Sequence, residues 1–275
     1  LVLFPVFLDD DYILYANTKF GDYPMILPKK KVYNIDEVFA NLWLLSYKKN
    51  VAVSSFIDSL HPNNITDENI RTYWAAKTGD KGEYASIDLG VNCDVCAIQV
   101  NFAEHNTTLF GRTKGKYHRY IIEYSTDNKK WVTIIDKTQN NTDNTQNYLQ
   151  LPNKINCRYI RIKNIEVPDG NFAISDLRIF GKGNGKKPMP VEIFNANRNK
   201  EDKRTISLTW NKVDNATGYI VSFGIDKNKL YNHYTLYGDT SVVINSLNSN
   251  EKYFFNIETF NENGITKSNI YLEAE

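Results

Sequence analysis

The fold of this chain is decided by the stretch Tyr120-Ile-Ile-Glu-Tyr-Ser-Thr-Asp-Asn-Lys-Lys-Trp131, together with Cys157-Arg-Tyr-Ile-Arg-Ile162 and Ala173-Ile-Ser-Asp-Leu-Arg-Ile-Phe-Gly181. In each stretch apolar and polar residues alternate, and turn-forming or charged residues follow. Alternation with a period of two is typical of half-buried strands, whereas a helix repeats its apolar residues every three or four positions. We therefore predict antiparallel strands that close a β-sandwich in an all-β chain.

Further strand and loop motifs lie upstream in a characteristic order, namely Val51-Ala-Val-Ser-Ser55, Ile65-Thr-Asp-Glu-Asn-Ile-Arg-Thr-Tyr-Trp74 and Tyr84-Ala-Ser-Ile-Asp-Leu-Gly90. Together with the first three stretches they resemble the discoidin family, also called F5/8 type C or galactose-binding-like domains. The resemblance covers roughly residues 42 to 183. It implies a jelly-roll β-sandwich, and we place this discoidin-like domain at residues 32–183.

A second domain is expected after the linker Gly181-Lys-Gly-Asn-Gly-Lys-Lys-Pro-Met-Pro190, whose Gly, Pro and Lys content favours an exposed connection. Strand patterns follow it at the spacing of a small sandwich, at residues 205–210, 218–224, 241–247 and 252–260. The strand that ends at Trp210 and the step from Leu247 to Tyr253, which looks like a tyrosine corner, resemble a fibronectin type III domain over residues 189–275.

The first 31 residues predict a β-hairpin, with strands at 3–7 and 12–15 around the turn Asp9-Asp10-Asp11. Their sequence, including Phe20-Gly-Asp-Tyr-Pro24, resembles the C-terminal stretch of the five-bladed propeller in family 43 glycoside hydrolases of the β-xylosidase or arabinofuranosidase type. Two isolated strands are marginal in water, so we expect this propeller-remnant hairpin to pack on the discoidin-like domain or on a propeller upstream. The chain starts without Met or a signal-peptide pattern, which favours a piece of a longer protein.

Composition argues against two classes of partner. Lys and Arg number 33 against 32 Asp and Glu, a formal charge of +1, so no strong positive field attracts nucleic acid. No apolar run approaches the roughly eighteen residues that a membrane-spanning helix needs. Aromatic residues make up 13% of the chain, which suits both sandwich cores and sugar-facing surfaces.

The cysteine pattern favours a structural role for the thiols. Cys93 and Cys96 form a CxxC pair, but no second ligand pair for zinc follows and no βαβ unit surrounds it for redox chemistry. We interpret these thiols, like Cys157, as small apolar groups that fill or border a core.

The discoidin resemblance implies a structural calcium ion. In sugar-binding members of that family the ion lies between the loop after the first strand and the penultimate strand, and Ca²⁺ prefers six to eight oxygen ligands. The matching positions are Asp67, Thr72 and Asp176 for side-chain oxygens and Asn69 for a backbone carbonyl. Glu68 stands where Gly is commoner, so it either adds a ligand or obstructs the turn. Alternatively, Asp67 and Thr72 only cap the loop.

Glycan recognition requires an aromatic face for a pyranose ring and a few polar groups for its hydroxyls. The sequence places such residues in loops between the predicted strands, and Trp74 is expected in the core. The candidate carbohydrate-binding residues are His105, Phe110, His118 and Phe172.

Catalysis is not expected within these residues. The adjacent carboxylates Asp9, Asp10 and Asp11 lie in a solvated turn, and glycosidases need two carboxyl groups that flank the scissile bond. We therefore expect an extracytoplasmic, non-catalytic module of a plant-polysaccharide-degrading hydrolase, which binds xylan or arabinan or braces an upstream catalytic propeller. A cell-surface adhesion module, or part of an active family 43-like enzyme whose catalytic domain lies upstream, are the alternatives.

Overall fold

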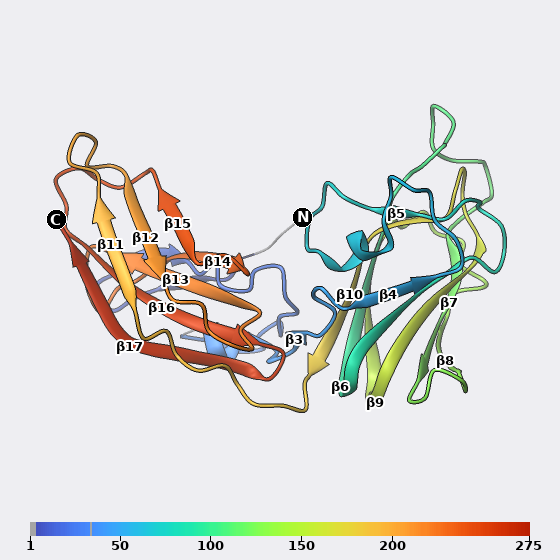
Figure 1. Ribbon diagram of the computed structural model, residues 1–275, viewed down its shortest axis with the longest axis horizontal. Coiled ribbons are helices and arrows are strands. Elements are labelled where there is room, and N and C mark those ends of the chain that lie inside the picture. The colour runs from blue at the N-terminus through green and yellow to red at the C-terminus, as the bar shows by residue number, and fades with distance from the viewer. Residues whose placement is uncertain (1–3, 34) are drawn as a thin grey trace. The chain divides into compact units, whose positions relative to one another are not determined.

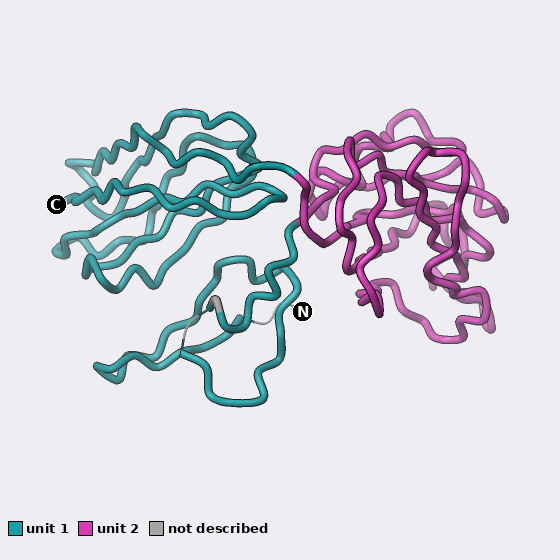
Figure 2. Tube along the Cα trace, turned by 90° about the horizontal axis from the view of Figure 1, so that it is seen from below, with its two compact units in different colours: residues 1–43, 185–275 teal, residues 44–184 magenta. Residues whose placement is uncertain are grey.

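The computed structural model describes residues 4–33 and 35–275, and the side chain of Asp36 is not considered. These residues form strands, loops and two short 3₁₀ helices, η1 (Ile35–Glu37) and η2 (Pro62–Thr66) (Figure 1). The predicted all-β class is therefore confirmed. The chain forms two compact units, residues 44–184 and residues 1–43 with 185–275 (Figure 2).

One eight-stranded antiparallel sheet builds the unit of residues 44–184. Its two longest strands, β6 (Tyr84–Phe102) and β9 (Gln146–Glu166), pair side by side and change register at Asp88/Cys93 and Val95/Ala97. Such bulges bend strands, and both strands are visibly curved in Figure 1. The other strands of the sheet are β3 (Trp43–Leu44), β4 (Asn50–Val53), β5 (Trp74–Ala75), β7 (Arg119–Ser125), β8 (Val132–Asp136) and β10 (Ala173–Lys182).

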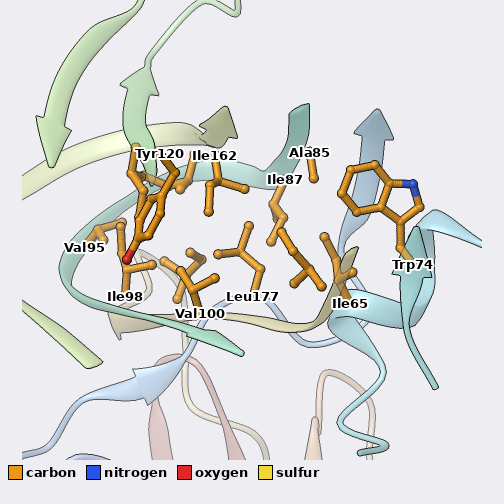
Figure 3. Close-up of a cluster of buried hydrophobic side chains, with 14 of the residues drawn as sticks. Ile65, Trp74, Ala85, Ile87, Val95, Ile98, Val100, Tyr120, Ile162 and Leu177 are labelled. Atoms are coloured by element: carbon orange, nitrogen blue, oxygen red, sulfur yellow. The ribbon is translucent and has the colours of Figure 1, made fainter. Parts of the chain in front are cut away.

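Inward-facing side chains of these strands form one continuous core. Figure 3 shows Ile98 and Val100 of β6 and their neighbour Leu177 of β10 on one side of this core, with Tyr120 and Ile162 on the opposite side, and all five are almost completely buried. Burial of an aliphatic side chain of this size contributes roughly 1.5–3 kcal/mol. The period-two patterns in the sequence are therefore the ones that build the core.

Two of the cysteines lie in this core, as the sequence indicated. Cys93 and Cys157 are cross-strand partners on β6 and β9, and both are buried. Burial raises the pKa of the Cys157 thiol to about 12, so it stays protonated at neutral pH. Cys96 is partly exposed.

Residues 194–274 form a second sandwich of two sheets. One sheet contains β11 (Phe194–Arg198), β12 (Ile206–Trp210) and β15 (Ser241–Ile244). The other contains, in spatial order, β14 (Asn232–Tyr237), β13 (Gly218–Gly224), β16 (Tyr253–Asn261) and β17 (Gly264–Ala274). The Tyr253 hydroxyl accepts a hydrogen bond from Asn248 N at 3.0 Å, which is the geometry of a tyrosine corner.

The N-terminal segment packs on this second sandwich, a partner that the sequence did not indicate. Its hairpin pairs β1 (Val6–Leu8) with β2 (Leu14–Ala16), and the Tyr15 ring stacks on Tyr231 with centroids 3.7 Å apart. Phe20 meets Phe260 edge to face at 5.5 Å. Phe7, Phe20 and Tyr23 are buried, whereas several aliphatic side chains of the segment, including Val6, Leu8 and Leu14, stay exposed. Leu3, the first residue of the expected strand, lies outside the described residues.

The boundary between the units also differs from the expected one between residues 31 and 32. Phe39 and Trp43 both pack on Phe20, with ring centroids 4.9 and 5.2 Å away. The compact unit of the middle domain accordingly begins at Leu44. In the part of the chain that the structure describes, no helix is long and apolar enough to span a membrane.

Candidate functional site

The loop that follows η2 brings several oxygen atoms together. The Asp67 carboxylate accepts a hydrogen bond from Asn69 N at 2.9 Å and from the Thr72 hydroxyl at 2.8 Å. The Thr72 hydroxyl also lies 2.9 Å from the carbonyl oxygen of Asn69. Three of the predicted calcium-binding residues therefore present a carboxylate, a hydroxyl and a carbonyl oxygen at one point, the kind of oxygen donors that Ca²⁺ prefers.

Glu68 does not obstruct this turn. It adopts the left-handed conformation with φ of 60°, which Gly adopts without penalty and other residues adopt at a cost of roughly 1–2 kcal/mol. Its carboxylate pairs with the Arg178 guanidinium at 2.9 Å, and both side chains are about nine-tenths buried. The ion pair attaches the loop to β10.

Asp176 lies on the same strand, two residues before Arg178, and side chains two apart project from the same face of a strand. It is 4% exposed, and it accepts a hydrogen bond at 3.2 Å from the Asn101 amide of β6. Because Glu68 reaches Arg178, the 67–72 loop lies over the face of β10 that carries Asp176. Within residues 4–33 and 35–275, no group of three or more His, Cys, Asp and Glu residues is arranged to hold a metal, so an ion here needs hydroxyl and carbonyl ligands as well.

Three loops of the middle domain, residues 103–118, 137–145 and 167–172, are joined by hydrogen bonds and are called the loop cluster below. Asn171 N donates to the His105 carbonyl oxygen at 2.9 Å, and Thr113 N donates to the Pro168 carbonyl oxygen at 3.0 Å. The long first loop is thereby held against the third. These contacts give the cluster a defined surface above the ends of the strands.

Arg112 is the charged centre of the loop cluster. Its Nη1 atom lies 2.5 Å from Oε1 of Glu104, and its Nε atom lies 2.8 Å from Oδ1 of Asp143. The Arg112 side chain is 27% exposed, whereas the two carboxylates are about half exposed. The arrangement fixes planar hydrogen-bonding groups at the surface.

Phe110 and His105 both lie in the loop cluster. The Phe110 side chain is 84% exposed and its neighbour Leu109 is 94% exposed, so together they form an apolar loop tip. His105 is partly buried, and its Nδ1 atom lies 3.1 Å from the Tyr73 hydroxyl. Tyr73 directly follows the 67–72 loop, so this contact joins that loop to the loop cluster.

The other two predicted carbohydrate-binding residues are buried, which corrects the expectation that their rings face a glycan. Phe172 is 1% exposed and packs edge to face on Trp74, which lies in the core as expected. His118 is 5% exposed and its ring stacks on Phe102 at 3.9 Å. Desolvation by burial, with a further contribution from Arg112, lowers the pKa of His118 to about 4. Both residues adjoin strands, and their side chains point inward.

Sequence reasoning missed Tyr73, Glu104 and Asp143. Arg112 and Asp143 are 31 positions apart, and no local pattern predicts that they meet. His61, another loop residue, has a different role, because its Nδ1 atom accepts from Asn63 N and caps η2.

Comparison with known proteins identifies the middle domain. Residues 50–176 match the F5/8 type C domain family, so the chain contains an F5/8 type C domain. No curated protein matches the sequence significantly.

Solved structures that are similar to part of this chain include carbohydrate-binding modules. CpGH89CBM32-4, produced by Clostridium perfringens and solved with GlcNAc-α-1,4-galactose, is 22% identical with a TM-score of 0.43, over 52% of this chain and 96% of that one. Chitosan-binding module 1 of a Paenibacillus sp. IK-5 chitosanase/glucanase is 19% identical with a TM-score of 0.41, over 50% and 98%. The family 32 module of C. perfringens NanJ, solved with galactose, is 17% identical with a TM-score of 0.42, over 50% and 98%.

Proposed function

We propose that this chain is a non-catalytic, carbohydrate-binding part of a glycoside hydrolase, and that its F5/8 type C domain binds glycan through the loop cluster. The observation that carries the proposal is the exposed tip of Leu109 and Phe110 beside the ion-paired Arg112. An aromatic ring that is open to solvent stacks on the apolar face of a sugar, while neighbouring charged groups hydrogen-bond to its hydroxyls.

A calcium ion at the 67–72 loop is the second part of the proposal. The ligands are the side chains of Asp67, Thr72 and Asp176 and the carbonyl oxygen of Asn69. The hydrogen bonds among Asp67, Asn69 and Thr72 support it, because they already hold these oxygens together. Its role is structural: the ion stabilises the loop that ends at Tyr73, whose hydroxyl contacts His105.

The parent enzyme and the target glycan are inferred from the resemblance of the N-terminal segment to family 43 glycoside hydrolases. The sequence of residues 3–24 supports a family 43-like β-xylosidase or arabinofuranosidase as the parent enzyme. Such an enzyme implies xylan or arabinan as the glycan and an extracytoplasmic location. The tyrosine corner and the arrangement of three and four strands in two sheets support a fibronectin type III assignment for the second sandwich. Adhesion to a protein partner is the competing function, and the exposed Leu109–Phe110 tip also suits it.

Calorimetry with xylo- and arabino-oligosaccharides, galactose and chitotriose tests glycan binding. One shallow stacking site predicts dissociation constants of order 0.1 to 1 mM, and Phe110→Ala should abolish the signal. Val132→Ala is the control, since Val132 is also exposed but lies on β8. Heat signals equal to dilution for every glycan contradict the proposal, and turnover of nitrophenyl glycosides contradicts the non-catalytic role.

Thermal unfolding tests the calcium ion separately. An ion that binds only the folded state raises stability, so added calcium should raise the melting temperature, and Asp176→Asn should remove that increase. Asp58→Asn, which changes an exposed carboxylate of the same domain, should retain it. No calcium in the purified protein by elemental analysis, with an unchanged melting temperature, rejects the site.

A further inference from the structure

A polar cleft of about 410 Å³ lies between the N-terminal segment and the outer face of the sheet that contains β13, β14, β16 and β17. Both walls belong to the unit of residues 1–43 and 185–275. Tyr15 and Lys19 contribute to one wall, and side chains of all four strands contribute to the other. The cleft is separate from the F5/8 type C domain.

The floor of the cleft is a row of polar side chains that crosses the sheet. His233 of β14 pairs with Ser222 of β13, Ser222 pairs with Asn256 of β16, and Asn256 pairs with Tyr271 of β17. Ser222 and His233 are also hydrogen-bonded, with Oγ and Nδ1 2.9 Å apart. Desolvation lowers the pKa of His233 to about 3, so its ring is neutral at physiological pH and acts as a hydrogen-bonding group.

Asn256 sits at an irregularity in the sheet. The register between β16 and β17 shifts between Asn256 and Glu258, and the Asn256 amide nitrogen donates to the carbonyl oxygens of Ser268 and Ile270 at 3.0 and 2.8 Å. Its Oδ1 atom is buried and has no hydrogen-bond donor among the described residues. Bulges occur often beside binding sites, and an unpaired buried acceptor is stabilised when a donor arrives.

The open side of the cleft is positively charged. The ammonium groups of Lys227 and Lys267 lie 5.1 and 5.5 Å from the centroid of the Tyr271 ring, and neither lysine forms an ion pair with a described residue. The remaining pair of charges, Lys19 and Glu258, is joined at 2.5 Å and partly buried. Two ammonium groups without an ion-pair partner among the described residues therefore lie near the Tyr271 ring at the end of the polar row.

We propose that this cleft binds a sugar that carries a carboxylate, such as a uronic acid residue of an acidic polysaccharide. The carboxylate pairs with Lys227 and Lys267, and charge-assisted hydrogen bonds of this kind are stronger than neutral ones. The hydroxyls meet the polar row at Asn256 and Ser222, and the sugar ring lies against Tyr271. This second ligand site is independent of glycan binding by the loop cluster.

Titration of the full chain with galacturonate oligomers, followed by NMR, tests the proposal. We expect saturable shifts in the signals of the Asn256 side-chain amide and Tyr271. The double variant Lys227→Gln/Lys267→Gln should bind about tenfold more weakly or worse. Lys200→Gln, which removes another exposed lysine of the same unit, and Phe110→Ala in the loop cluster should both bind as the unaltered chain does.

Three outcomes overturn the proposal. Equal affinity for neutral oligomers of the same length removes the role of the carboxylate. Equal shifts with inorganic phosphate or citrate show an anion site without sugar recognition. The absence of any shift at Asn256 and Tyr271, in a chain whose circular dichroism spectrum shows it to be folded, shows that the cleft is not a site.

Discussion

The two units of this protein are assembled from the chain in different ways. Residues 44–184 form an uninterrupted domain, in which the strands β6 and β9 contribute most of the sheet pairing. The other unit joins residues 1–43 to residues 185–275, which lie on either side of that domain in the sequence. A folding unit that is continuous in sequence can thus be predicted from its run of strand patterns. A short hairpin with exposed apolar faces needs a partner elsewhere in the chain, and the local sequence does not indicate which one.

The largest expected loss of stability comes from removing the aromatic contact between the two segments of the discontinuous unit, residues 1–43 and 185–275. Phe20 is 5% exposed and packs against Phe39, Trp43 and Phe260. Phe20→Ala should destabilise this unit by about 3–5 kcal/mol, because it removes a buried aromatic ring and leaves a cavity. Denaturation followed by hydrogen exchange should show lost protection in β16 and unchanged protection in β6.

A matched control for this variant is Tyr12→Ala in the same N-terminal segment. Tyr12 is 84% exposed, so its truncation should leave exchange in β16 unchanged. If Phe20→Ala alters β6 as strongly as β16, or alters neither strand, the N-terminal segment does not belong to the second sandwich.

Acid should weaken both units, through a buried histidine in each. Burial lowers the pKa of His118 to about 4 and that of His233 to about 3. An unfolded chain binds a proton at each histidine below about pH 6.5, while the folded units do not, so stability falls as the pH drops from 6.5 towards these values. For His118 the loss is on the order of 3 kcal/mol.

A histidine variant tests how much of this pH dependence belongs to the middle domain. His118→Phe retains an aromatic ring beside Phe102 and removes the titrating group, so stability of the middle domain should become flatter between pH 6.5 and 4. The charged groups that act on His118 are Arg112 and Asp143, and both remain in this variant. An equally steep loss of stability in this variant would contradict the assignment.

A smaller effect is expected at the tyrosine corner of the second sandwich. Tyr253→Phe removes the acceptor of the hydrogen bond from Asn248 N. The cost should be about 1–3 kcal/mol, because a part-buried backbone N–H group loses its partner. Urea denaturation measures the change, and a loss confined to the F5/8 type C domain would argue against the corner.

The smallest effects should come from exposed ion pairs, and they should be alike in both units. Lys252 pairs with Glu273 in the second sandwich, and Lys154 pairs with Asp94 in the F5/8 type C domain. The side chains are 42% and 51% exposed in the first pair and 69% and 30% exposed in the second. Solvent screens such pairs, so Lys252→Gln and Lys154→Gln should leave the denaturation midpoint unchanged within error. A clear shift in one unit alone would show that its surface charges contribute unequally.

Sequence patterns predicted the strands better than the sites. The motifs around Tyr120, Cys157 and Ile174 became β7, β9 and β10, because period-two alternation is a local property of the chain. The burial of Phe172 and His118 was not predicted, because it depends on Trp74 and Phe102, which approach from other strands. Glu68 illustrates the same point, since its role follows from Arg178, which lies 110 positions away.

The sequence by itself determined the all-β class and the F5/8 type C domain, and it indicated a linker at residues 181–190 and the tyrosine corner. Each of these depends on residue spacing within a strand, a turn or a short loop, and local spacing is read directly from the chain. Only the tertiary structure decided that residues 4–43 complete the second sandwich, that Arg112 joins Glu104 to Asp143, and that a polar row crosses four strands from His233 to Tyr271. These features arise where segments that are distant in sequence meet. The free energy gained by burying such segments against each other cannot be predicted from local residue spacing.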